Sequence, residues 1–207
     1  MGMTRPPPDL TDVQVRVKAL ASVLTEKGMV RQETLDAIVE HYETRVGPHR
    51  GAQLVARAWT DPAFKTQLLQ DASGAITAMG FAGLEATHME VKENTPKVHN
   101  LVVCTLCSCY PWGTLGLPPM WYKSAPYRSR AVRDPRGLLQ EFGVPLADDV
   151  EIRVWDSTAD IRYLVLPMRP KGTEKLSAGK LAAMVTRDSM IGTAVIAAPA
   201  RWREARR

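Results

Sequence analysis

The three cysteines of this 207-residue chain, Cys104, Cys107 and Cys109, lie within six residues of one another. An odd number of cysteines so close together does not fit a disulfide framework. Thiolates are soft ligands that suit zinc, copper(I), iron or cobalt. The residue types alone therefore predict a metal site on a loop.

A structural zinc site is the first alternative, but it requires four protein ligands. The histidines available as a fourth ligand are scattered along the chain, at His41, His49, His88 and His99. His99 is nearest in sequence, and on a strand it would lie roughly 16 Å before the loop. We therefore expect His99 to be a core or surface residue.

The single residue between Cys107 and Cys109 indicates a different kind of site. A metal bound by both sulfurs would lie against the main-chain amides of Ser108 and Cys109, and these nitrogens could become ligands. The chelate rings closed in this way have five or six members, which are unstrained sizes. Two sulfurs and two nitrogens would form a plane, with Cys104 in one axial position.

This claw of three thiolates and two deprotonated amides carries a large negative charge, which favours a trivalent ion, iron(III) or cobalt(III). Its sixth position stays open for water or substrate, as a Lewis-acid catalyst requires. Electron-rich thiolates also invite oxidation to sulfenate and sulfinate. The remaining negative charge calls for cationic hydrogen-bond donors.

The elements that must position this loop form an α+β fold, with a helical N-terminal half followed by a mixed α/β layered sandwich that carries the claw. Apolar residues at helical spacing predict helices over residues 13–24, ended by Gly28, and over 35–42, and then a short helical segment over 54–59. Asp61 and Pro62 open a further helix that is expected to run toward Gly80. We expect residues 1–85 to pack on a partner subunit and 86–207 to form the catalytic domain.

Strands are predicted from their β-branched and aromatic residues at 89–92, 99–104, 150–155 and 161–166. The last two are expected to pair, because the residues between them, 156–160, are polar enough for a turn. A short helix is predicted over 136–142, and Ser177 is expected to cap a final helix that extends through Val185.

The distribution of charged and apolar residues argues against nucleic acid and membrane as partners. The chain has a net charge of +5 and a pI of about 9.2, but its basic residues alternate with acidic ones or lie at the extreme C-terminus. This pattern favours solvated faces over a nucleic-acid surface. The sequence shows neither an apolar run of membrane-spanning length nor a signal region at its start, so we expect a cytoplasmic protein without membrane contact.

At the cysteine loop the chain resembles the nitrile hydratase α subunit of the cobalt type, whose motif is Cys-Thr-Leu-Cys-Ser-Cys. The iron type has serine at the position of Thr105. The resemblance covers about residues 13 to 195, including the segments Val154-Trp155-Asp156-Ser157, Arg133-Asp134-Pro135-Arg136 and Trp121-Tyr122-Lys123.

The resemblance implies a role for each site residue. Cys104, Cys107 and Cys109 are the sulfur ligands, and Ser108 and Cys109 give the nitrogens. Cys107 would be the sulfinate and Cys109 the sulfenate, with the Ser108 hydroxyl oriented toward them. Two arginines of a separate β subunit would hold the sulfur-bound oxygens.

Trp112 and Glu85 are the candidates for the substrate pocket. The resemblance implies that Trp112 forms part of its wall, at the interface between the two subunits. Glu85 stands where the family usually has a glutamine, and Gly113 stands where it has a proline after Trp112. A carboxylate at position 85 would alter the hydrogen bonding near the site.

The expected activity is the addition of water to a nitrile to give an amide. Cobalt(III), one per subunit, acts as the Lewis acid, iron(III) is less favoured, and no organic cofactor is expected. Hydroxide and the Cys109 sulfenate oxygen both remain candidates for the nucleophile. The sequence also leaves open which nitriles are accepted and whether the assembly is αβ or α2β2.

Two alternatives remain. One is the γ subunit of thiocyanate hydrolase, which shares the claw motif. The other is a non-catalytic thiol module, either a zinc-binding interaction protein or a redox sensor.

Overall fold

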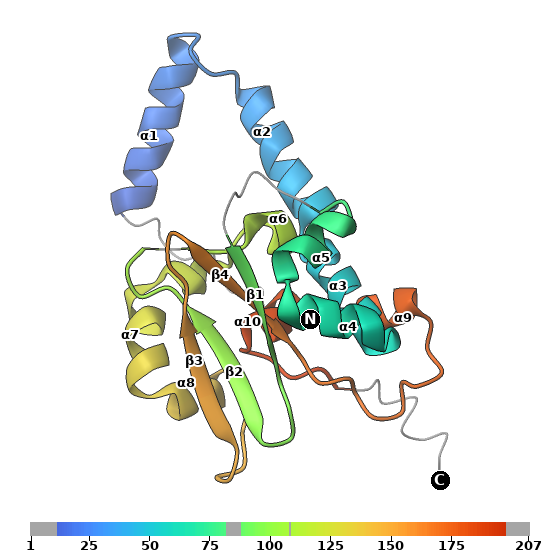
Figure 1. Ribbon diagram of the computed structural model, residues 1–207. Helices are drawn as coiled ribbons and strands as arrows, with labels where there is room; N and C mark the ends of the chain where they lie inside the picture. Colours follow the sequence, from blue (N-terminus) through green and yellow to red (C-terminus); the bar gives the residue numbers. More distant parts are fainter. Residues whose placement is uncertain (1–11, 82–87, 108, 198–207) are drawn as a thin grey trace, which may run out of the picture. The chain divides into compact units, whose positions relative to one another are not determined.

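The computed structural model describes residues 12–81, 88–107 and 109–197 (Figure 1). The chain divides into two compact units, Met1–His41 and Tyr42–Arg207. The sequence analysis placed its boundary later, after residue 85. The helices that follow Tyr42 belong to the same hydrophobic core as the strands, because the apolar faces of these helices pack against the sheet residues. Packing of the N-terminal region on a partner stays a prediction.

The first unit contains α1 (Asp12–Glu26) and α2 (Gln32–Glu40). The helix stop predicted at Gly28 is confirmed, since this glycine has a φ of +66°, which other residues rarely adopt. Large apolar side chains of this unit are exposed at Val15, Val17, Leu20, Val23, Met29, Ile38 and Val39. After α2 the chain continues as a π-helical turn, η1 (His41–Val46).

Three helices open the second unit: α3 (His49–Thr60), α4 (Pro62–Gln70) and α5 (Ala72–Ala78). The Asp61 side chain caps α4 by accepting from Phe64 N at 3.0 Å, as the sequence predicted. The expected continuous helix to Gly80 is wrong. Asp71 leaves the helical conformation, with a φ of −141°, and its side chain caps α5 by accepting from Gly74 N.

The four strands are β1 (His88–Glu93), β2 (Val98–Val103), β3 (Glu151–Asp156) and β4 (Ile161–Leu166). β1 pairs in parallel with β4, and β2 in parallel with β3, so the expected pairing of the last two strands is wrong. Ser157 N donates to Val103 O at 2.7 Å and extends the β2–β3 pair. His88 N donates to Asp160 O, which begins the β1–β4 pair. The polar segment after β3 therefore crosses between two pairs instead of forming a hairpin.

The remaining helices are short, and their bounds are α6 (Trp112–Leu115), η2 (Met120–Lys123), α7 (Ala125–Arg133), α8 (Pro135–Glu141), α9 (Ala178–Ala182) and α10 (Arg187–Ile191). Of these, α6 and α9 pack on α3. α7 and α8 lie along the β2–β3 pair, and α10 packs on β4 and β2 (Figure 1). The helix predicted over 136–142 is confirmed as α8. Ser177 precedes α9 without a side-chain cap, and α9 ends at Ala182, short of the predicted Val185.

The core lies between the strands and the helices of the second unit. Its largest fully buried apolar side chains are Leu54, Leu68, Leu101, Leu115, Leu139, Leu164, Leu166, Leu181, Met190 and Ile191. The α+β class predicted from the sequence is confirmed. Within the described ranges, no helix combines the length and apolar character needed to span a membrane.

Candidate metal centre

The cysteine loop begins where β2 ends, and β3 anchors it there. The parallel register sets Val103 opposite Asp156, which brings the carboxylate beside the first residues of the loop. Asp156 accepts from Thr105 N at 2.9 Å and from the Thr105 hydroxyl at 2.5 Å. Cys104 itself is buried, with 1% of its surface exposed. Cys104 is thus held by the core, and Cys107 after it is exposed.

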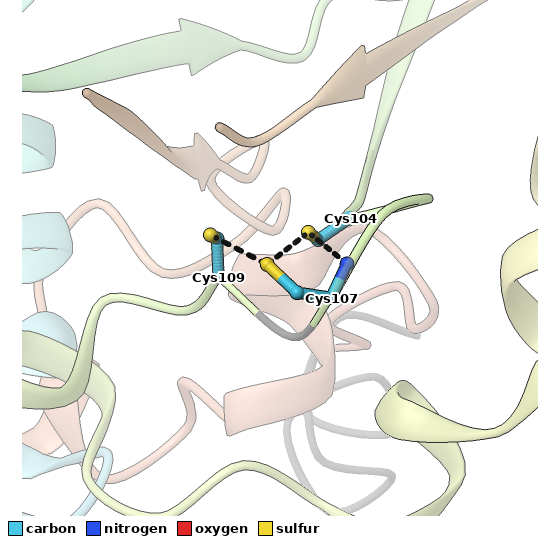
Figure 2. Close-up of side chains that lie close together, drawn as sticks. All are labelled: Cys104, Cys107 and Cys109. Atoms are coloured by element: carbon cyan, nitrogen blue, oxygen red, sulfur yellow. Dashed lines mark hydrogen bonds between the residues drawn. The ribbon is translucent and has the colours of Figure 1, made fainter. Parts of the chain in front are cut away.

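The loop brings the three sulfurs together (Figure 2). Cys107 Sγ lies 3.5 Å from Cys104 Sγ and 3.1 Å from Cys109 Sγ. All three sulfurs lie within 4.8 Å of one another. Cys107 is exposed and Cys109 partly exposed, so the cluster opens to the surface.

The sulfur spacing suits a shared cation. With metal–sulfur bonds of about 2.3 Å, sulfurs that bind one ion at adjacent positions lie about 3.3 to 3.8 Å apart. The separations of 3.1 and 3.5 Å from Cys107 Sγ are close to this range. The three soft donors are therefore placed where one metal ion could bind them.

The surroundings of Cys109 disfavour the charged form of its thiol. Burial first, then the hydrogen bond with Cys107 and the charge of Cys104, raise the pKa of Cys109 to about 12, while the positive charge of Arg162 acts in the opposite direction. Crowded sulfurs cannot all carry charge without compensation. A bound metal would supply that compensation and favour the thiolates.

Main-chain oxygens of the loop are held by donors from η2 and α7. Tyr122 is fully buried and its hydroxyl donates to Cys109 O at 3.0 Å. Arg128 Nη1 donates to Cys107 O at 3.1 Å and to Leu106 O at 3.5 Å. These bonds fix the backbone at the cluster even though the side chains of Cys107 and Cys109 reach the surface.

The remaining predicted site residues divide into two groups. Ser108 and Glu85 lie outside the described residues. Trp112 is the first residue of α6, three residues after Cys109, and is partly buried against the core. Its ring lies edge-on to Tyr42 at 5.9 Å, and Lys123 Nζ is 5.6 Å from its centre. Its role in a substrate pocket stays a prediction.

His99 belongs to a separate buried cluster at the start of β2. Its Nε2 faces Gly192 O at 2.7 Å, and because a carbonyl only accepts, Nε2 carries the proton. Nδ1 then accepts from Asn94 Nδ2 at 3.4 Å. Burial lowers the pKa of His99, and the bond to Gly192 partly opposes this shift. The expectation that His99 is not a cluster ligand agrees with this placement.

Three residues at the centre were missed by the sequence analysis: Asp156, Tyr122 and Arg128. Asp156 could have been found from the register of two parallel strands, since it ends the strand that pairs with the one before Cys104. Tyr122 and Arg128 contact the loop from two short helices, η2 and α7, that were not predicted from the sequence.

Comparison with known proteins agrees with this geometry. The family profile "Nitrile hydratase, alpha chain" matches residues 11–194. The low-molecular weight cobalt-containing nitrile hydratase subunit alpha of Rhodococcus rhodochrous is 54% identical over 190 residues, 92% of each chain. The subunit gamma of thiocyanate hydrolase from Thiobacillus thioparus is 38% identical over 198 residues, 90% of this chain and 81% of the relative.

Solved structures give the same result. A double mutant of Fe-type nitrile hydratase from Comamonas testosteroni Ni1 superposes with a TM-score of 0.81 at 44% identity, covering 90% of this chain and 91% of that one. The profile match spans most of the chain, and the similarity includes the segment that carries the sulfur cluster. The chain therefore belongs to the nitrile hydratase α-chain family, whose enzymes hydrate nitriles to amides.

Proposed function

We propose that this chain is the metal-carrying α subunit of a cobalt-type nitrile hydratase. The observation that carries the proposal is the convergence of three cysteine sulfurs from one loop, close enough for one metal ion to bind all three. Cys104, Cys107 and Cys109 would hold the metal through sulfur, and Ser108 and Cys109 through main-chain nitrogen. When bound, the trivalent metal supplies a Lewis acid that polarises the nitrile.

Cobalt is favoured over iron by Thr105, because the iron type of the family carries serine there. A relative named as cobalt-containing shares 54% identity with this chain, which supports the same choice. The Fe-type structure at 44% identity shows that the fold serves either metal, so metal analysis must decide between them.

Oxidised cysteines and a partner subunit complete the proposal. Cys107 and Cys109 are accessible from the surface, and accessible thiolates are the ones most readily oxidised. We expect Cys107 as the sulfinate and Cys109 as the sulfenate, with arginines of a β subunit binding their oxygens. Trp112 and Glu85 would contribute to the pocket at that interface. The assembly, αβ or α2β2, and a cytoplasmic location stay predictions.

The alternatives fit less well. Thiocyanate hydrolase is represented by a more distant relative, at 38% identity. A zinc-binding module would require a fourth ligand, and in the described parts of the chain the cluster contains only the three cysteines. A redox sensor would leave the membership of this enzyme family unexplained.

The test is co-expression of the full chain with its β subunit in cobalt medium. We expect about one cobalt per αβ pair, an α-chain mass increased by three oxygens, and amide formation from nitriles in preference to thiocyanate hydrolysis. The chain alone should be nearly inactive, since it lacks the β-subunit arginines and the second wall of the pocket. Zinc with unmodified thiols, or full activity of the isolated chain, would refute the proposal.

A further inference from the structure

A positively charged side chain of this chain, that of Arg128, is hydrogen-bonded to the main chain of the cysteine loop. Arg128, on α7, directs Nη1 to the carbonyl oxygen of Cys107 at 3.1 Å. The helix is tied to β2 by the neighbouring residue, because the Tyr127 hydroxyl donates to Val102 O at 2.6 Å. The guanidinium therefore reaches the loop from a support that is itself fixed to the strand before Cys104.

The oxygen that Arg128 binds belongs to a particular peptide group. The Cys107 carbonyl carbon is bonded to the nitrogen of Ser108, which is one of the two main-chain ligands in the proposed function. A peptide nitrogen that binds a metal as an anion shares its negative charge with the carbonyl oxygen through the same resonance that makes the peptide planar. A guanidinium that donates to this oxygen forms a charge-assisted hydrogen bond and stabilises that charge.

A second donor on the loop provides a comparison within the same site. Tyr122 donates a neutral hydroxyl to Cys109 O at 3.0 Å. That carbonyl shares its peptide with the nitrogen of Tyr110, which is not a proposed ligand. The shorter bond of the charged donor, at 3.1 Å, is to a peptide that supplies a ligand nitrogen, and its longer contact, 3.5 Å to Leu106 O, is to one that does not. The neutral donor bonds only to a peptide without a ligand nitrogen.

We infer that Arg128 is a positioning residue that stabilises the main-chain nitrogen ligand at Ser108 by neutralising charge on the Cys107 carbonyl oxygen. The inference rests on the proposed function. It assigns to this chain a cationic contribution to the centre that is separate from the β-subunit arginines expected at the sulfur-bound oxygens.

The test compares Arg128→Lys, Arg128→Gln and Arg128→Met in the full chain co-expressed with its β subunit under limiting cobalt. Arg133→Gln, an exposed arginine on the last turn of the same helix, is the matched control. Two readouts are taken besides activity: cobalt per complex, and the position of the thiolate-to-cobalt charge-transfer absorption band.

Arg128→Met should lower cobalt content about ten-fold, the change expected when one charge-assisted hydrogen bond is lost. Without the cation more electron density remains on the ligand nitrogen, so the metal becomes richer in electrons. The charge-transfer band should then move to shorter wavelength in the Gln and Met variants. Arg128→Lys should restore most of both readouts, and Arg133→Gln should match the wild type.

The outcomes separate this inference from the proposed function. A wild-type complex without cobalt would refute the proposed function. A cobalt-loaded wild type together with unchanged cobalt content and an unchanged band in Arg128→Gln and Arg128→Met would overturn the inference. Equal cobalt losses in all three Arg128 variants with an unshifted band would also overturn it, because Arg128 would then only support the folded loop.

Discussion

Strand β2 has a polar cluster at each end, and the two clusters differ in how their polar groups are paired. At the start of the strand, Asn94, His99 and Asn100 are buried and bond to one another and to Trp155. At its end, Cys104, Cys107 and Cys109 bring three thiols together, and two of the three reach the surface.

The difference separates a structural cluster from a functional one. Asn100 donates to Asn94 Oδ1 and to Glu93 O, and its own oxygen accepts from Trp155 Nε1 at 2.8 Å. Donors and acceptors alternate, so the first cluster stabilises the fold without a ligand. The sulfurs offer donor atoms for a cation, and burial first, then the neighbouring sulfurs, raise the pKa of Cys109. Such a cluster is completed by a metal.

The largest effect should come from Cys109→Ser. The substitution removes one sulfur from the proposed ligand plane, and a hydroxyl is a poor ligand for a site built from soft donors. We expect cobalt content and amide formation to fall to background in the complex with the β subunit. Normal cobalt content and turnover in this variant would show that Cys109 is not a ligand.

Asn100→Ala tests the opposite end of the strand. It removes the acceptor of Trp155 Nε1 and the side-chain donor to Glu93 O, whereas Asn94 Oδ1 keeps its bond from Asn100 N. The free energy of unfolding should therefore fall by about 3 kcal/mol. Chemical denaturation of the purified chain measures this change. Cobalt per folded complex should stay near the wild-type value, and its loss would break the distinction between the two clusters.

His99 should add a smaller, pH-dependent contribution. Burial holds the pKa of His99 below its ordinary value of 6.5, so the unfolded chain binds a proton that the folded chain does not. The free energy of unfolding should therefore keep its full value above pH 6.5. It should fall as the pH drops from 6.5 toward the lower pKa of the folded state. Denaturation midpoints measured from about pH 7.5 to about pH 5, the range in which an imidazole titrates, should show this slope in the wild type. If His99→Gln retained the same slope, the titration would belong to another group.

The smallest effect should come from Lys97→Met, beside the buried cluster. Lys97 pairs with Asp149, and both side chains are largely exposed, at 72% and 64%. Exposed ion pairs contribute less than about 1 kcal/mol. A loss of stability comparable to that of Asn100→Ala would mean that burial does not decide which polar contacts stabilise this strand.

Local features could be predicted from the sequence, but the pairing of strands that are far apart along the chain could not. The cysteine cluster, the stop at Gly28 and the cap at Asp61 depend on neighbouring residues and could be read from their order. The pairing of β3 with β2 depends on the tertiary fold, and a polar turn before β4 wrongly indicated a hairpin. Arg128 contacts a carbonyl oxygen, and every residue presents one, so no sequence pattern marks this bond.

The most direct test of the proposed centre is a crystal structure of the active, cobalt-loaded complex, refined without restraints on the metal bonds. The account predicts five protein donors from residues 104–109, with sulfur from each cysteine and main-chain nitrogen from Ser108 and Cys109. A metal held by side chains alone, or full activity in a complex without metal, would contradict it.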